Sequence, residues 1–109
     1  MENKTIIEEL YFCAAQCVSC YNACEREKDK EKFERCMALD KDCEDVCRLT
    51  AQILERNPEN GELLLKVCSD ICVKCAAECE KHSSIEHCKQ CAEVCRKCAE
   101  MCLIEETAL

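Results

Sequence analysis

Residues 88–102 read CKQCAEVCRKCAEMC, which places five cysteines at alternating spacings of three and four residues. The same alternation is found in residues 68–79, which read CSDICVKCAAEC. Side chains three and four residues apart lie on one face of an α-helix. The spacing therefore predicts long helices that each present a stripe of thiols to their neighbours.

The thiol stripes belong to an internal repeat of 55 residues. Cys88 and Cys95 correspond to Phe33 and Asp40, and there the repeat is broken. We therefore expect a duplicated helical hairpin, with repeats over 5–56 and 58–109. The other cysteines form the pairs Cys13/Cys68, Cys17/Cys72, Cys20/Cys75, Cys24/Cys79, Cys36/Cys91, Cys43/Cys98 and Cys47/Cys102.

Helix start and stop signals divide the chain into four predicted helices. Thr5-Ile6-Ile7-Glu8 and Ser83-Ser84-Ile85-Glu86 have the capping-box pattern, so helices are expected from residue 5 to about 28 and from residue 83 onward. Asp29 is a candidate cap for a second helix ending near residue 56, and residues 57–61 precede a third helix ending near residue 82. The predicted fold is all-α: a single domain over 1–109, forming an antiparallel up-down-up-down four-helix bundle with cysteines lining its central channel, or lumen.

The abundance of cysteine needs a chemical explanation. Sixteen of the 109 residues are cysteine, and a core filled by thiols alone would leave costly cavities. Cysteines on one helix have Cβ atoms ~5–6 Å apart, whereas a disulfide needs ~3.5–4.5 Å. Bridges between helices remain possible on oxidation, but metal binding explains the stripes better.

Charge and hydropathy exclude several kinds of partner. The net charge of −8 and the scattered basic residues disfavour nucleic acid. Residues 1–9 lack the features of a secretory signal, and no run approaches the ~18–20 apolar residues of a membrane span. We expect a soluble cytosolic protein, whose thiols stay reduced. The sequence shows no catalytic constellation, so we do not expect an enzyme.

Soft thiolates select Cu(I), Zn(II) or iron–sulfur clusters. Zinc and iron–sulfur sites need separate sets of about four ligands, which a continuous stripe does not provide. Cu(I) accepts about two or three thiolates, and its single charge offsets one buried thiolate. We therefore predict storage of many Cu(I) ions, about one per cysteine; zinc or iron–sulfur binding and a thiol redox buffer are the alternatives. The predicted ligands are Cys13, Cys17, Cys20, Cys24, Cys36, Cys43, Cys47, Cys68, Cys72, Cys75, Cys79, Cys88, Cys91, Cys95, Cys98 and Cys102.

The two ends of the predicted lumen differ. One end, the mouth, carries Cys24, Cys36, Cys79 and Cys88, and we expect His82, His87 and Met37 to admit metal there, because imidazole and thioether can pass on Cu(I). Asp40 lies within a thiol stripe, where its carboxyl can accept hydrogen bonds from thiols or cap a cluster. An apolar plug is predicted at the other end, and the aromatic residues are expected to serve in packing or subunit contacts. The plug consists of Ile6, Leu10, Leu54, Leu64 and Leu65, and the aromatic residues are Tyr11, Phe12, Tyr21 and Phe33.

A family resemblance supports the copper interpretation. The pattern Cys68-x3-Cys72-x2-Cys75-x3-Cys79, then Lys81-His82, then His87-Cys88-x2-Cys91-x3-Cys95-x2-Cys98-x3-Cys102 resembles the bacterial cytosolic copper storage proteins. Leu39-Asp40, followed by Cys43 and Cys47, is similar to the second helix of that family, so the resemblance extends over residues 13–102.

The resemblance implies a lumen filled with Cu(I), histidines at an open mouth, Asp40 at the edge of a cluster and a homotetramer. It also implies copper donors and acceptors as partners. The periplasmic branch of the family has an export signal and a methionine-rich mouth. This chain shows neither, which favours the cytosolic branch.

Overall fold

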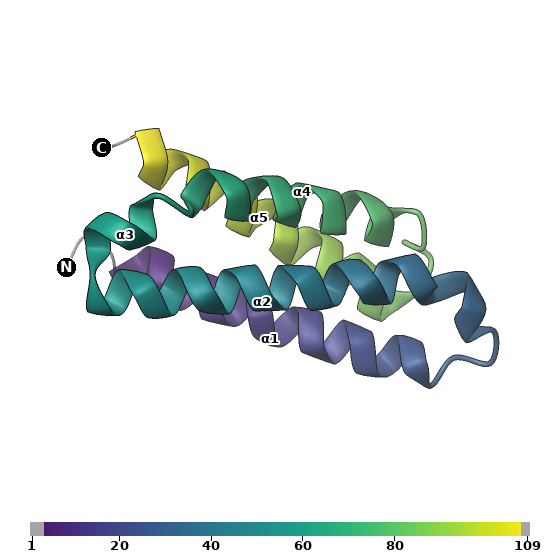
Figure 1. The fold of residues 1–109 in the computed structure, drawn as a ribbon. Helices are drawn as coiled ribbons and strands as arrows, with labels where there is room; N and C mark the ends of the chain where they lie inside the picture. The colour runs from purple at the N-terminus through teal and green to yellow at the C-terminus, as the bar shows by residue number, and fades with distance from the viewer. Residues whose placement is uncertain (1–3, 108–109) are drawn as a thin grey trace.

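The computed structural model describes residues 4–107, with an elongated shape of 44 × 20 × 18 Å. Four long helices account for most of it: α1 (Lys4–Glu25), α2 (Glu34–Arg56), α4 (Leu65–Glu80) and α5 (Glu86–Thr107). A short 3-10 helix, η1 (Lys30–Phe33), precedes α2, and the short helix α3 (Pro58–Glu62) precedes α4. The long helices form an antiparallel bundle, as predicted (Figure 1).

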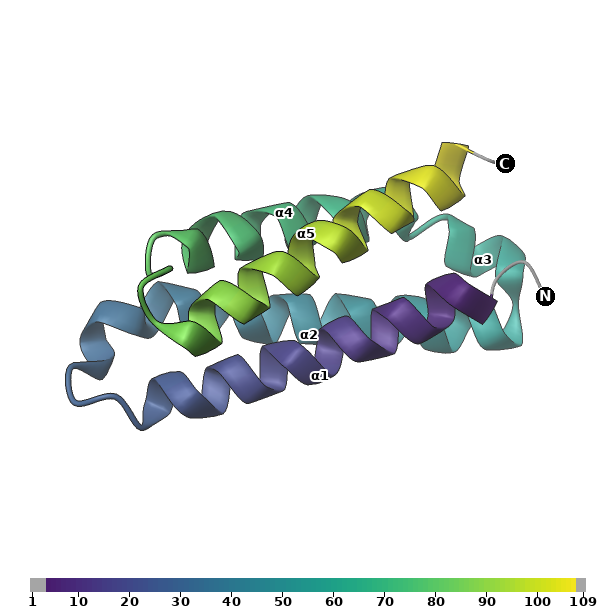
Figure 2. The same cartoon turned by 180° about the vertical axis from the view of Figure 1, so that it is seen from behind.

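The two hairpins pack side by side. Helix α1 pairs with α2 and α4 with α5, and the hairpins meet where α2 lies beside α4 and α1 beside α5 (Figures 1 and 2). Some polar contacts within each hairpin lie on its exposed outer edge: the Tyr11 hydroxyl donates to Glu55 at 2.8 Å, and Arg96 donates two hydrogen bonds to Glu80, each at 2.8 Å. The interior between the four helices is left to other side chains.

Local backbone hydrogen bonds shift several helix ends from their predicted positions. Helix α1 ends at Glu25, before the predicted residue 28, because the amides of Arg26 and Glu27 bond back three residues and tighten the chain into a turn. The predicted third helix is divided into α3 and α4, since three-residue bonds also form around residues 60–64. Asp29, the candidate cap of the second helix, precedes η1, and its side chain makes no capping hydrogen bond. Helix α5 begins at Glu86, three residues after the predicted start at residue 83. Thr5, the first residue of the predicted capping box, lies inside α1, which begins one residue earlier, at Lys4.

The apolar plug closes the end of the bundle near α3. Ile6, Leu10, Leu54 and Leu65 are at most 2% exposed, whereas Leu64 is only half-buried. Gly61 permits this closure, because a Cβ atom there would lie 2.6 Å from Leu54 Cγ and 2.7 Å from the Leu54 backbone nitrogen. A side chain at residue 61 would therefore push α3 away from α2.

The four aromatic residues have different environments. Phe33 is buried, and Tyr11 and Tyr21 are half-buried, in agreement with packing roles. The Phe12 side chain is 57% exposed, so it is available for a surface contact.

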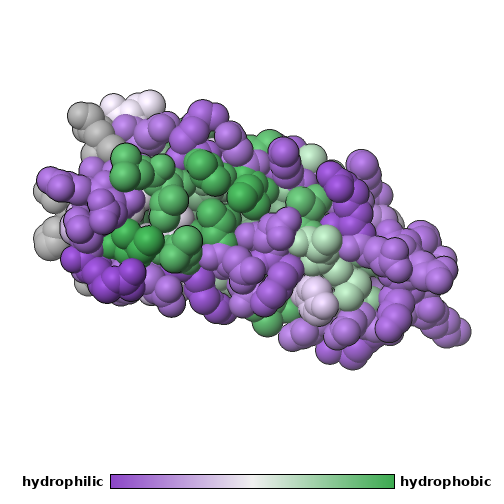
Figure 3. All heavy atoms as spheres, viewed as in Figure 1, coloured by the Kyte–Doolittle hydropathy of each residue, from purple (hydrophilic) through white to green (hydrophobic). Residues whose placement is uncertain are grey.

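The outer surface of α2 and α4 near α3 carries an apolar patch, which Figure 3 shows in green. We call this patch the apolar face. Leu49, Leu63 and Val67 are 46%, 77% and 49% exposed, although large apolar side chains usually lie inside a protein. Within the described part of the chain, no helix combines the length and apolarity needed to span a bilayer. The apolar face consists of Val46, Leu49, Ile53, Leu63, Leu64, Val67 and Ile71.

Candidate metal centre

All sixteen cysteines point into the lumen, where they are fully buried free thiols. The prediction that thiols line the bundle is thus confirmed, and the helical spacing explains it, because each stripe follows the inward face of its helix. Every long helix contributes: Cys13, Cys17, Cys20 and Cys24 from α1; Cys36, Cys43 and Cys47 from α2; Cys68, Cys72, Cys75 and Cys79 from α4; and Cys88, Cys91, Cys95, Cys98 and Cys102 from α5.

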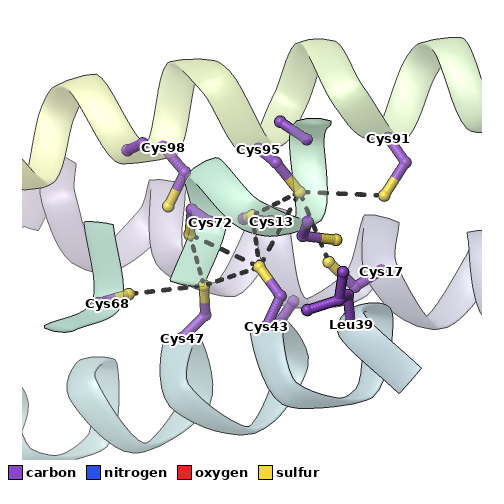
Figure 4. Close-up of a cluster of buried hydrophobic side chains, with 14 of the residues drawn as sticks. Cys13, Cys17, Leu39, Cys43, Cys47, Cys68, Cys72, Cys91, Cys95 and Cys98 are labelled. Atoms are coloured by element: carbon purple, nitrogen blue, oxygen red, sulfur yellow. Dashed lines mark hydrogen bonds between the residues drawn. The ribbon is translucent and has the colours of Figure 1, made fainter. Parts of the chain in front are cut away.

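The middle of the lumen brings sulfur atoms from all four helices together (Figure 4). The Cys43 Sγ lies 3.5 Å from the Cys72 Sγ and 3.9 Å from the Sγ atoms of Cys13, Cys47 and Cys95. These separations are well beyond the S–S bond of ~2.05 Å in a disulfide. Such S···S distances are compatible with weak hydrogen bonds between neutral thiols, or with sulfurs that bind the same metal ion.

The possible ligand sets overlap. In each set, one ligand atom per residue lies within 4.8 Å of the others, and successive sets share at least one cysteine. The sets therefore form a continuous row of possible ligands along the lumen. From the deep lumen to the mouth, the sets include Cys13/Cys43/Cys47/Cys72, Cys13/Cys17/Cys43/Cys95, Cys17/Cys75/Cys91/Cys95, Cys20/Asp40/Cys79/Cys91 and Cys20/Cys24/His87/Cys88.

Asp40 is the carboxyl group within this column of thiols. It is fully buried, and its Oδ1 accepts hydrogen bonds from the thiols of Cys75 and Cys91, at 3.2 and 3.4 Å, as the sequence suggested. Burial raises the pKa of Asp40 to about 11. The carboxyl group is therefore protonated and neutral in the metal-free protein at neutral pH.

His87 places an imidazole among the thiols of the mouth. Its Nδ1 lies 3.5 Å from the Cys88 Sγ and 3.7 Å from the Cys20 Sγ. Burial raises the pKa of Cys88 to about 12, so this thiol is also protonated before metal binds. On the other side of the ring, Nε2 lies 3.0 Å from Oε2 of Glu27. Sequence reasoning missed Glu27, which lies in the turn after α1, outside any helical pattern.

The other two candidates at the mouth have different surroundings. The His82 ring packs on Phe33, with ring centroids 4.7 Å apart, and its Nε2 lies 3.8 Å from the Glu78 carboxylate. Met37 is half-buried and packs against the core. Of the two histidines, His87 is therefore the one with a ring nitrogen that the structure places against cysteine sulfurs.

Comparisons with known proteins point to one family. A family model described as "Copper storage protein" (Csp) matches residues 1–106. The "uncharacterized cysteine-rich protein YhjQ" of Bacillus subtilis (strain 168) is 32% identical over 90 residues, which is 83% of this chain and 82% of YhjQ.

Solved structures of similar chains extend this finding. A cytosolic copper storage protein from Streptomyces lividans with five coppers is 36% identical, with a TM-score of 0.91 over 95% of this chain and 91% of that one. The Cu(I)-bound copper storage protein BsCsp3 is 31% identical, with a TM-score of 0.88 over 94% and 95%. Apo-Csp3 from Bacillus subtilis is likewise 31% identical, with a TM-score of 0.87 over 95% and 98%.

The protonated state of Asp40 has a measurable consequence. Because folding raises its pKa above the unfolded value of about 3.9, its stabilising contribution is complete below about pH 4 and is lost as pH rises towards the folded pKa. Between pH 5 and 8, the contribution of Asp40 to the free energy of unfolding should therefore fall by about 1.4 kcal/mol for each unit by which pH rises. In Asp40→Asn this contribution should be absent, so stability should decline less steeply with pH. Urea denaturation of the reduced apo protein measures the slope.

Asp42→Asn is the matched control, because Asp42 is exposed on the same helix. Identical slopes for the wild type and Asp40→Asn would contradict a protonated Asp40.

Proposed function

Because this chain belongs to the copper storage protein family, we propose that it stores many Cu(I) ions as thiolate clusters inside its four-helix bundle. The observation that carries this function is the buried column of sixteen free thiols, at least twelve of which belong to overlapping ligand sets. A protein that held one structural ion would need only one such set.

Charge explains the preference for a univalent ion. Each thiolate in the lumen is shielded from water, where a lone charge is costly. One Cu(I) per thiolate leaves the lumen neutral, so we propose that all sixteen cysteines are ligands and that capacity approaches about sixteen ions per chain. Loading then exchanges thiol protons for metal.

The fold should persist without metal. Relatives with and without copper resemble this chain equally well, with TM-scores of 0.88 for Cu(I)-bound BsCsp3 and 0.87 for apo-Csp3. Charged outer surfaces, the apolar plug and the loop contacts do not depend on copper. Metal binding is therefore proposed to fill a preformed lumen.

The family resemblance and the Streptomyces relative also suggest the setting. That relative is described as cytosolic, and we propose the same location for this chain. Copper donors and acceptors would be its partners at the mouth. The family is named for storage, not catalysis, and we propose no enzymatic role.

We further propose that metal is exchanged at the mouth. His87 is the first candidate, because its Nδ1 adjoins two cysteine sulfurs. His82 and Met37 would assist from the rim, and Asp40 would cap a cluster just below.

The first test is anaerobic titration of the reduced protein with Cu(I) in competition with a chelator of known affinity. We expect colourless loading to about one ion per cysteine and near-equal helicity by circular dichroism before and after loading. Saturation at about four ions per chain, or a visible iron–sulfur chromophore, would instead favour the zinc or iron–sulfur alternatives. Reversible disulfide formation at moderate potentials without metal would favour a redox buffer.

The second test concerns the mouth. His82→Ala combined with His87→Ala should slow both loading and removal of Cu(I), because the imidazoles that pass the ion to sulfur are lost. Total capacity should be nearly unchanged, since all the cysteines remain. Stopped-flow mixing with a chromophoric Cu(I) chelator measures both rates, and unchanged kinetics would refute the exchange role.

The third test concerns self-association. The apolar face supports the proposed homotetramer, because patches of this kind mark interaction surfaces. Val67→Glu would bury a charge in that contact and should reduce the mass found by sedimentation velocity. Leu103→Glu is the control, since Leu103 is exposed on α5, outside the apolar face. Equal masses for the wild type and Val67→Glu would contradict an interface at this face.

A further inference from the structure

We propose that Glu27 is a positioning residue for metal exchange: it holds His87 so that the unprotonated Nδ1 faces the thiols of Cys20 and Cys88. This inference rests on the proposed storage function. It also makes a claim about the metal-free protein that can be tested separately.

The geometry of the mouth carries the proposal. The Glu27 carboxylate lies 3.0 Å from Nε2 of His87, while Nδ1 of the same ring lies 3.5 and 3.7 Å from two cysteine sulfurs. A carboxylate only accepts hydrogen bonds, so the nitrogen facing it must carry the proton. In a neutral imidazole, the other nitrogen then has a free lone pair, and here that lone pair points towards the ligand set Cys20/Cys24/His87/Cys88.

The backbone fixes the carboxylate beside this ligand set. Glu27 lies in the turn after α1, and its amide donates to the carbonyl oxygen of Cys24 at 3.1 Å. The turn therefore couples Glu27 to a residue that itself supplies a thiol to the set. His87 lies in the first turn of α5, so the contact joins the ends of two helices at the mouth.

The second histidine of the mouth lacks such a partner at hydrogen-bond distance. The Glu78 carboxylate lies 3.8 Å from His82 Nε2 and is closer to the cations of Lys81, at 3.2 Å, and Arg35, at 3.5 Å. His87 is therefore the histidine whose ring is oriented by an acid.

An orienting carboxylate has a recognised effect on a metal-binding imidazole. It fixes the tautomer, holds the ring in place and makes the ligand nitrogen more basic, and losing it commonly costs 10- to 100-fold in metal affinity or activity. A purely structural ion pair between these side chains would have little effect, because their 33% and 20% exposure leaves the pair partly solvated. The two roles therefore predict different results when Glu27 is replaced.

The first experiment determines the tautomer of His87 in the reduced, metal-free protein. We use long-range ¹H–¹⁵N NMR at a pH where the ring is neutral. In the wild type, Nε2 should carry the proton and Nδ1 should not; in Glu27→Ala, a population with protonated Nδ1 should appear. Glu27→Gln should largely keep the wild-type tautomer, because its side-chain oxygen can still accept from Nε2. Glu25→Ala, which removes an exposed acid from the same helix end, should change nothing.

A protonated Nδ1 in the wild type, or an unchanged tautomer in Glu27→Ala, would overturn the proposal. Circular dichroism of each variant shows that the bundle has folded.

The second experiment measures transfer of the first equivalents of Cu(I) from a chromophoric chelator. Glu27→Ala should slow transfer by about tenfold, within the range for lost orienting partners, and leave total capacity unchanged. Because Glu27 acts through His87, Glu27→Ala/His87→Ala should be no slower than His87→Ala alone. Additive slowing in the double variant, or no slowing in the single one, would refute the positioning role. A wild type that binds only about four ions would refute storage instead, and the tautomer experiment would still decide the role of Glu27.

Discussion

The cost of charge in a lumen shielded from bulk solvent governs this structure. Sixteen thiols can occupy the lumen only if they are neutral or if each negative charge is matched by a positive one. Protons provide the neutral state in the metal-free protein, because burial disfavours the charged form of a thiol. Univalent ions provide it in the loaded protein. The two states therefore differ in which cation accompanies the sulfur, and the helices need not move.

Such a core contributes little packing energy, so stability must come from other parts of the fold. Cysteine is smaller than the leucine or isoleucine that usually fills a bundle. The compensating feature lies beyond the thiols, at one end of the bundle, where Leu10, Leu54 and Leu65 form a buried plug. Storage capacity and stability thus occupy separate regions of the molecule.

The sequence predicted the features that depend on helical periodicity. The 3-4 spacing placed every thiol in the lumen, and the same argument placed Asp40 among them. It could not predict features set by loops. The division of the third helix depends on the three-residue backbone bonds around residues 60–64, and the contact of Glu27 with His87 depends on the turn after α1. Both histidines were expected at the mouth, but only coordinates distinguish the one beside sulfur from the one stacked on Phe33.

The duplicated hairpin explains how a nearly symmetric lumen acquires a direction. Seven cysteine pairs are preserved between the repeats, so the deep lumen offers an ion similar surroundings from either hairpin. Among the residues that line the lumen or its mouth, the differences between the repeats include four positions: Glu27 corresponds to His82, Lys32 to His87, Phe33 to Cys88 and Asp40 to Cys95. Each difference places a group of different chemistry at equivalent positions of the two hairpins. Under the proposed function, the repeat supplies capacity, and its departures from symmetry supply the groups that we propose admit and release ions.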